Sequence, residues 1–580
     1  MQLVDETLVV FVVSTTGNGE FPAPARPFWQ FLLRRALPED ILSDVAFATF
    51  GLGDSTYARY CWSSRMLNRR LQGLGARQIV LPGEADDQHY AGIDGGLQPW
   101  LEELWRTLDA VLEPLPAGVE PIPDDQLLPP RIHAHLTDDA PAPASELSLD
   151  EDQCMARLTT NRRITAEDHF QDVRFVELQL PDELQLPDTQ PLPAYRPGDV
   201  VAVHPENRAE DVDHLLERMG WTGVADTPVH LENRDRHRPL PEEMQREMER
   251  RTLTLRRLLT RYLDPFAVPR RTFFETICHF SPHDHMEHEK LAEYLQPGDG
   301  TLDMYEYAQR VRRTASEVLD EFKSVQVPPE YVAELFPLMR ERQFSIASGP
   351  TTHPRTLQLL VAIVRYRTRL RKPREGVCSS WLARLEPGAL LPVRLQPGTL
   401  TVPATANTPV VAVGPGTGIA PLRSIVQERI AAKTPASNTL VFLGCRYLAK
   451  DCLLRDEWEQ LARNRRGAHS GAAADADEAL GALTLADKPG VLLWIAASRD
   501  QEGRKVYVQD RLREQGAQVW DTLGPQRGIL YICGNSGRMP EQVREAVRDI
   551  VAEHGEMDTD QATRFLQRLE AERRLQEETW

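Results

Sequence analysis

The chain has 580 residues, of which 41% are apolar and 26% charged, and its formal net charge is −19. This length exceeds what one hydrophobic core supports, so we expect three or four domains of a globular protein. The negative charge disfavours binding to nucleic acid and suits docking to a partner with a basic face, although it also serves simple solubility.

No apolar stretch approaches the roughly 18 residues that a membrane helix needs, and the N-terminus lacks the pattern of a secretory signal. Seven cysteines lie scattered along the chain, in an odd number and without a CxxC spacing. Such a distribution is unlike a disulfide framework and suits a reducing compartment. We therefore expect a cytoplasmic protein without a membrane segment.

Residues 1–108 alternate apolar strands with helical stretches. Strands are predicted in LVVFVVST, VAFATFGLGD and ARQIVLPG, and helices around 28–35, around 62–74 and up to 108. The alternation predicts a parallel sheet with helices on both faces. Residues 109–154 then gather prolines and acidic residues with little apolar periodicity, which predicts an extended tether between domains.

Residues 155–215 and 338–402 contain short β-type runs, which we interpret as two parts of one antiparallel barrel. Residues 216–337 follow a helical pattern between them, so a helical insertion into the barrel is expected. Within the insertion, His279 and His283 have a spacing that could bind zinc on one helix, but Pro282 interrupts that helix. We therefore predict no metal site.

Two runs in the barrel carry residues suited to a flavin. RQFSIAS places Arg342 and Phe344 on one strand face, where they could address a pyrophosphate and a flavin ring, while Ser345 faces the other way. GVCSSWL, residues 376–382, offers hydroxyl and N–H groups before a helix, as an anion cradle would. Either run is also compatible with ordinary barrel structure. Together with Trp580 at the chain end, they suggest a flavin platform with a removable lid.

From residue 403 onward strands and helices alternate again, with a last helix expected to lead to Trp580. GPGTGIAPLRS, residues 414–424, follows an apolar strand and opens a helix, which suits a pyrophosphate; a tight turn without a ligand is the alternative. Cys533 ends a later strand, where open α/β sheets bind ligands, or is a buried structural cysteine. Two cations and two hydroxyls that could hold a 2′-phosphate, or be ordinary surface groups, are Ser498, Arg499, Lys505 and Tyr507.

The motifs RQFSIAS, GVCSSWL, GPGTGIAP, FLGCR, SRDQEGRKVYVQ, ICGNSGRM and the terminal ETW, in this order and spacing, resemble those of the diflavin reductases over nearly the whole chain. RRTFFE, SIASGPTTHP and GNSGRMPEQV are most similar to the NADPH-dependent branch that serves cytosolic iron–sulfur cluster assembly. The resemblance implies a multidomain α/β protein with a flavodoxin-like FMN domain, an FAD-binding barrel and a Rossmann-like NADPH-binding domain of the ferredoxin reductase type. It also implies hydride transfer from NADPH to FAD, then single electrons through FMN to an iron–sulfur or haem protein, here an anamorsin-like iron–sulfur protein.

The resemblance further assigns site residues. It implies that the nicotinamide is placed by Ser345, Cys533 and Glu578, with Glu578 replacing the more common Asp, and that Trp580 must leave before nicotinamide binds. Phe344 stands where these enzymes usually carry Tyr. The implied FAD residues are Arg342, Phe344, Ser345, Gly376, Val377, Cys378, Ser379 and Trp580. The implied NADPH residues are Gly414, Gly416, Thr417, Gly418, Ser498, Arg499, Lys505, Tyr507 and Gln509.

The FMN match is incomplete, because the chain starts one or two strands too late to contain the loop that cradles the FMN phosphate. At about 1.5–3 kcal/mol for each charge-assisted bond lost, FMN affinity is expected to fall by several kcal/mol. An FAD-only NADPH diaphorase and a docking scaffold without FMN are therefore the alternative functions. The implied FMN residues are Thr15, Thr16, Gly17, Asn18, Gly51, Leu52, Gly53, Asp54, Tyr57 and Asp86.

Overall fold

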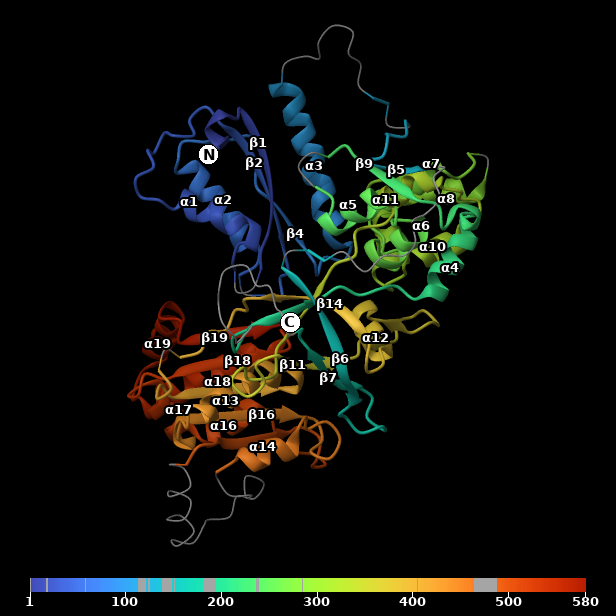
Figure 1. Cartoon of the computed structure of the whole chain (residues 1–580). Helices are drawn as coiled ribbons and strands as arrows, with labels where there is room; N and C mark the ends of the chain where they lie inside the picture. The colour runs from blue at the N-terminus through green and yellow to red at the C-terminus, as the bar shows by residue number, and fades with distance from the viewer. Residues whose placement is uncertain are drawn as a thin grey trace.

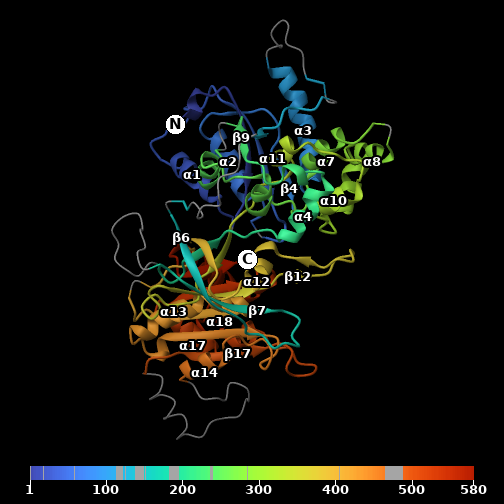
Figure 2. The same ribbon diagram turned by 45° about the vertical axis from the view of Figure 1, so that its right-hand side comes forward.

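Two α/β sheets, an antiparallel barrel and a helical insertion make up the described chain (Figure 1). Figures 1 and 2 both show the N-terminal α/β unit beside the insertion, with the barrel and the C-terminal α/β unit together at the other end of the molecule. None of the helices in the described part of the chain combines the length and apolarity of a bilayer span. The structure is a computed structural model, and it describes residues 2–16, 19–57, 59–112, 122–123, 126–137, 149–150, 152–181, 195–235, 239–283, 285–403, 405–463 and 488–580.

The N-terminal unit is a parallel sheet, as its alternating pattern predicts. Its elements are β1 (Leu8–Ser14), α1 (Arg26–Leu32), β2 (Ala46–Gly53), α2 (Trp62–Gln72), β3 (Arg77–Gln78), β4 (Gly83–Asp86) and α3 (Gly92–Val111). The central strand β2 pairs in parallel with β1, β3 and β4. Parallel pairing brings the carboxyl ends of β1, β2 and β4 to one edge of the sheet, which is where open α/β sheets bind ligands.

The barrel is assembled from the two predicted segments. Its strands are β6 (Gln153–Arg163), β7 (Val173–Gln179), β8 (Val200–Val203), β10 (Arg342–Ser345), β11 (Thr356–Ala362) and β14 (Leu390–Gln396), paired antiparallel in the order β10-β8-β14-β6-β7-β11. The edge strands β10 and β11 follow each other in the chain, so the sheet is nearly closed. A short hairpin of β12 (Arg365–Tyr366) and β13 (Arg374–Glu375) leads into α12 (Val377–Arg384).

The insertion is helical around an apolar core that includes Leu258, Phe274 and Val318. α7 ends at His279, before Pro282, so His279 and His283 do not share a helix, as expected. The helices are α4 (Ala209–Arg218), α5 (Glu242–Glu249), α6 (Leu255–Arg257), α7 (Arg271–His279), α8 (Met286–Tyr294), α9 (Asp299–Met304), α10 (Ala315–Glu321) and α11 (Val332–Leu335).

The predicted tether at 109–154 contains a strand that the sequence analysis missed. β5 (Ile132–Leu136) pairs antiparallel with β9 (Val229–Asn233) of the insertion. The run IHAHL alternates apolar and polar residues as a half-buried strand does, but it is only five residues long and stands among prolines and acidic residues. Its partner strand lies far away in the chain, so the whole segment was interpreted from the sequence as a tether. Other parts of the tether, such as 113–121 and 138–148, lie outside the described residues.

The C-terminal unit is a parallel sheet in the order β17-β16-β15-β18-β19. The expectation that a last helix leads to Trp580 is wrong, because β19 follows that helix and pairs with β18. Its sequence, LQEET, lacks the apolar alternation of a strand. The elements are β15 (Val410–Pro415), α13 (Ile419–Ala431), β16 (Thr439–Cys445), α14 (Arg455–Leu461), β17 (Leu492–Ala497), α16 (Val508–Glu514), α17 (Gly516–Leu523), β18 (Ile529–Gly534), α18 (Arg538–His554), α19 (Thr559–Ala571) and β19 (Leu575–Thr579).

Helix α13 fastens this unit to the barrel. The buried guanidinium of Arg423 donates to the carbonyl oxygen of Ala347 at 2.7 Å and to Gln358 Oε1 at 2.8 Å, and its Nε lies 2.8 Å from Glu457 Oε1. Ser424 Oγ donates to the carbonyl oxygen of Ser348 at 2.7 Å. Because the loop after β10 receives these bonds, the position of β10 is tied to the start of the C-terminal sheet.

The Arg423→Met variant is expected to lose about 3 kcal/mol of stability, because buried acceptors and Glu457 lose their cation. The Arg455→Met variant is the matched control, since Arg455 pairs with Glu459 on the surface of one helix and such pairs contribute about 0.3–0.5 kcal/mol. Thermal unfolding followed by intrinsic fluorescence measures both. Equal melting temperatures for the two variants would contradict the stabilising role of the Arg423 contacts.

Candidate functional site

The glycine-rich turn after β15 lies against the end of β18. Gly416 has φ +57°, a conformation that favours glycine, and a Cβ on Gly418 would lie 2.2 Å from the carbonyl oxygen of Cys533. Thr417 lies between them, and Gly414 ends the apolar part of β15. The turn opens α13, whose first N–H groups and dipole favour an anion. These features fit a dinucleotide pyrophosphate.

The predicted 2′-phosphate residues follow β17, at the same edge of the sheet. Ser498 is fixed by its N–H, which donates to the carbonyl oxygen of Cys445 at 3.0 Å. Arg499 and Lys505 are exposed, and Tyr507 precedes the first residue of α16. Gln509 differs, because its side chain is buried and donates to Gln542 Oε1 at 3.3 Å. Ser498 and Arg499 thus directly follow β17, Lys505 and Tyr507 lie in the connection from β17 to α16, and Gln509 points toward α18.

Three residues from distant parts of the chain converge between the barrel and the C-terminal sheet. Ser345, the last residue of β10, donates its hydroxyl hydrogen to Glu578 Oε1, and Thr399 Oγ1 donates to Glu578 Oε2 at 3.2 Å. Glu578 stands opposite Cys533 in the parallel pairing of β18 and β19. A junction of the barrel with the C-terminal sheet is therefore lined by a hydroxyl, a thiol and a carboxyl group.

Burial controls the ionisation of this group. It raises the pKa of Glu578, against the hydrogen bonds from Ser345 and Thr399 that favour the charged form. Burial, and then the charge of Glu578, raise the pKa of Cys533 well above its usual value. Cys533 is fully buried and therefore stays a neutral thiol near neutral pH, which suits a packing and positioning group and excludes a reactive thiolate.

Trp580 is attached to the same junction through its main chain. Its N–H donates to the carbonyl oxygen of Gly534 at 3.1 Å, and its carbonyl oxygen accepts from the N–H of Ser536 at 3.1 Å. The residue is 49% exposed. Because the backbone bonds do not involve the indole, the ring can change rotamer while the chain stays paired. This freedom is what a removable lid requires.

The predicted FAD residues occupy neighbouring parts of the barrel. Arg342 and Phe344 lie on β10 opposite Val203 and Val201 of β8, and both side chains are partly exposed. The N–H of Gly376 donates to the carbonyl oxygen of Val364 at 2.9 Å, which fixes the start of α12. Of the other residues in this loop, Val377 is the first of the helix, Ser379 Oγ accepts from the N–H of Val364 at 3.0 Å, and burial raises the pKa of Cys378 to about 12.

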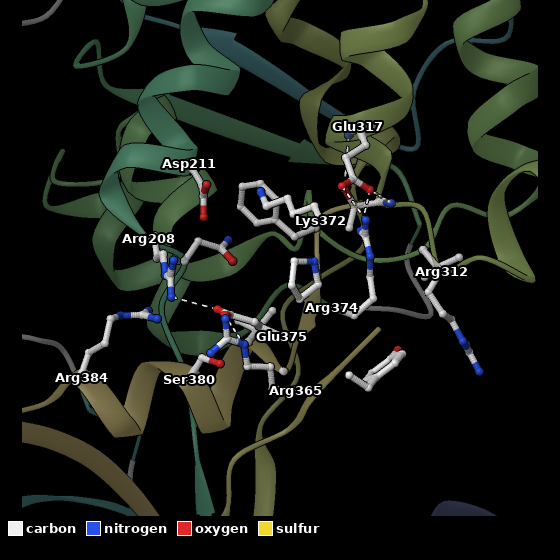
Figure 3. A pocket seen from close by; sticks show the side chains of 18 of the residues that line it. Arg208, Asp211, Arg312, Glu317, Arg365, Lys372, Arg374, Glu375, Ser380 and Arg384 are labelled. Carbon is white, nitrogen blue, oxygen red and sulfur yellow. Dashed lines mark hydrogen bonds and ion pairs between the residues drawn. The ribbon is translucent and has the colours of Figure 1, made fainter. Parts of the chain in front are cut away.

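A cavity of about 370 Å³ opens beside the start of α12 (Figure 3). Figure 3 shows Arg208, Arg365 and Arg384 gathered around it, with Arg208 Nη2 3.0 Å from Glu375 Oε2. More cationic than carboxylate side chains line the cavity, which fits a diphosphate held at the helix N-terminus. Sequence analysis missed these residues; the run RYRTRLRKPR, which Glu375 separates from GVCSSWL, is the signal that could have found Arg365.

The predicted FMN residues meet at the carboxyl edge of the N-terminal sheet. The N–H of Thr15 donates to the carbonyl oxygen of Leu52 at 2.9 Å, which joins the ends of β1 and β2. Asp86 Oδ1 accepts from the N–H of Ser55 at 2.9 Å, which brings β4 to the same place. Burial by itself would raise the pKa of Asp86, but hydrogen bonds from Ser55 and Gln88 favour the charged form and hold this pKa below its usual range.

The remaining FMN residues belong to the same three loops. Thr16 exchanges backbone hydrogen bonds with Glu20, Gly51 and Gly53 end β2, and Asp54 accepts from the N–H of Thr56 at 2.9 Å. Tyr57 is 40% exposed and so offers a ring face to a ligand. Gly17 and Asn18 lie outside the described residues.

One ion pair joins this edge to the C-terminal unit. Arg59, two residues beyond Tyr57, places Nη2 3.9 Å from Glu570 Oε2 on α19. Glu570 also pairs with Arg544, whose Nε lies 2.5 Å from Glu577 Oε1, next to Glu578. A chain of charges thus connects the loop predicted to bind FMN with the strand that carries Glu578.

Comparisons with known proteins agree with this arrangement. The flavodoxin family matches residues 1–100, the FAD binding domain family 148–381 and the oxidoreductase NAD-binding domain family 412–545. The chain is 41% identical to NADPH-dependent diflavin oxidoreductase 1 of Mycosarcoma maydis, over 100% of this chain and 91% of that protein. The proteins of the same name from Xenopus laevis and Bos taurus are each 37% identical, over 100% of this chain and 92% of theirs.

The chain belongs to the NADPH-dependent diflavin oxidoreductases. It is therefore a flavoprotein oxidoreductase with domains for FMN, FAD and NADPH, and a member of a family that reduces a redox protein. The predicted family and fold class are confirmed. The roles of the individual site residues remain predictions that follow from their positions.

The Glu578→Gln variant is expected to gain stability relative to the native chain as pH rises. Burial raises the pKa of Glu578 in the folded state, so the protonated form stabilises the fold in acid and this contribution is lost as pH rises through the raised pKa. A glutamine does not ionise and so avoids the loss.

Melting temperatures from pH 4 to pH 8 measure this effect. The difference between variant and native chain is expected near zero at pH 4 and largest at pH 8. The Glu577→Gln variant is the control, because it breaks the ion pair with Arg544 and is expected to lower stability at pH 8. A constant difference for Glu578→Gln across this range would contradict a buried, protonatable carboxyl.

Proposed function

We propose that this chain oxidises NADPH at the junction of the barrel and the C-terminal sheet, and delivers single electrons from its N-terminal domain to an iron–sulfur or haem protein in the cytosol. The contact of Ser345 with Glu578, opposite Cys533, carries the proposal. This contact places Ser345, the last residue of β10, against the pair of β18 and β19, which ends beside the glycine turn at Gly416.

The residues of the chain contribute binding and orientation. When bound, nicotinamide and flavin supply the hydride chemistry, and the protein fixes their distance. The turn at Gly416 and the start of α12 each offer N–H groups to a diphosphate, while Ser345, Cys533 and Glu578 offer hydrogen-bonding groups at the junction. The indole ring of Trp580 would cover the junction and move away when nicotinamide binds.

Delivery to a protein acceptor is supported by the N-terminal domain. Its candidate ring loops meet at an exposed sheet edge, and the contact of Arg59 with Glu570 brings that edge to the C-terminal unit. The net charge of −19 suits a partner with a basic face. Within this class, we propose an anamorsin-like iron–sulfur protein and a role in cytosolic iron–sulfur cluster assembly, since the motif variants resemble that branch.

Flavin content and acceptor specificity test the function together. The diflavin reductase is expected to show two flavins for each purified 580-residue chain, FAD and FMN in equal amounts after reconstitution with excess FMN, and NADPH-driven reduction of both ferricyanide and cytochrome c. FAD alone, with fast ferricyanide and slow cytochrome c reduction, would favour the diaphorase. Failure to reduce any acceptor with NADPH, ferricyanide included, would reject the proposal and leave the docking scaffold.

Selection of NADPH is tested by replacing both exposed cations of the 2′-phosphate set. The double variant Arg499→Ala with Lys505→Ala is expected to lower kcat/KM for NADPH about 10- to 100-fold, at about 1.5–3 kcal/mol for a charge-assisted bond, and to change NADH little. Arg513→Ala is the control, because Arg513 is an exposed cation paired with Asp549 on the same unit. Equal losses for the two cofactors would remove these residues from the phosphate site.

A further inference from the structure

Three potential metal ligands gather on the ribbon of β5 and β9, away from the reductase site. His133 and His135 are two residues apart on β5 and therefore share a face. The antiparallel register sets Glu232 opposite His133 and His230 opposite His135, so all four side chains project from that face. None of them belongs to the NADPH, FAD or FMN set.

The distances between the ligand atoms fit a coordination shell. His133 Nδ1 lies 2.9 Å from His135 Nε2, and His135 Nε2 lies 3.2 Å from Glu232 Oε2. The three ligand atoms all lie within 4.8 Å of one another. With metal–ligand bonds of about 2.0–2.2 Å, neighbouring ligands of a tetrahedral zinc ion stand about 3.3–3.5 Å apart. The side chains therefore need only small rotations to surround an ion.

The existing hydrogen bonds of the two histidines and Glu232 are weak, so a metal ion can displace them. Glu232 also accepts from Arg234 at 3.3 Å, but both side chains are nearly half exposed, and such pairs contribute little. Two imidazoles with a carboxylate suit zinc and related transition metals, whereas Mg²⁺ and Ca²⁺ prefer oxygen ligands.

We propose that His133, His135 and Glu232 bind one divalent transition-metal ion of the zinc class, with water or His230 completing the shell. The site joins β5, which lies in the connection from the N-terminal domain, to β9 of the insertion through side chains as well as through backbone bonds. The ion would strengthen this attachment and takes no part in electron transfer.

Zinc binding by the full-length flavoprotein tests the site. Equilibrium dialysis counts the bound ions, and calorimetric titration with zinc chloride measures their affinity. The His135→Ala variant is expected to bind one zinc ion fewer per chain than the native protein, and Glu232→Gln to weaken that ion about tenfold or more. NADPH-driven ferricyanide reduction is expected to be unchanged in both variants.

The His283→Ala variant is the matched control. His283 Nδ1 and His288 Nε2 form a second histidine pair in the insertion, 3.1 Å apart, but His288 Nδ1 also donates to the carbonyl oxygen of Cys278. Zinc bound by cysteines elsewhere would add the same number of ions to every variant and to the native chain, so it would not affect the difference between them. The proposal is overturned if His135→Ala binds as many ions as the native chain with the same affinity, or if His283→Ala loses the ion instead.

Discussion

The buried guanidinium of Arg423 holds together the two parts of the reductase that must meet for hydride to pass. It ties α13, which begins at the glycine turn, to the loop that directly follows β10. This contact therefore fixes the separation between the glycine turn and the strand that carries Ser345. The hydrogen bond of Ser345 with Glu578 depends on this placement, because its two partners belong to different sheets.

At the junction of the barrel with the C-terminal sheet, the carboxyl group of Glu578 is hydrogen-bonded by hydroxyl groups. Glu578 is partly buried, and the hydroxyls are those of Ser345 and Thr399. Low polarity strengthens every electrostatic interaction nearby and disfavours a fixed negative charge. A neutral carboxyl, a neutral thiol and two hydroxyls thus form a lining that can adjust its hydrogen bonds to a ligand without carrying net charge at acid pH.

Much of the fold follows from local patterns, whereas Glu578 and the FMN residues were assigned only through the family resemblance. Apolar alternation predicts both parallel sheets, the divided barrel and the insertion, and motif residues such as Gly416 and Gly376 lie at strand and helix ends where the patterns place them. β5 was missed because its short alternating run stands among prolines and acidic residues, and β19 because LQEET is polar and pairs with a strand elsewhere in the chain. Arg208 and Arg384 were missed for the same reason, since only the tertiary fold brings them to one cavity.

The N-terminal domain is held on two sides by contacts of unequal strength. At α19 it is joined by the pair of Arg59 and Glu570, 3.9 Å apart and partly exposed, which is weak and screened by salt. At α3, Gly92 lies so close to Tyr305 of the insertion that a Cβ would be 2.7 Å from its ring, and Asp94 is sheltered enough for burial to raise its pKa. Salt therefore weakens the α19 contact before the packed α3 contact, and any outward rotation of the N-terminal domain would pivot on α3.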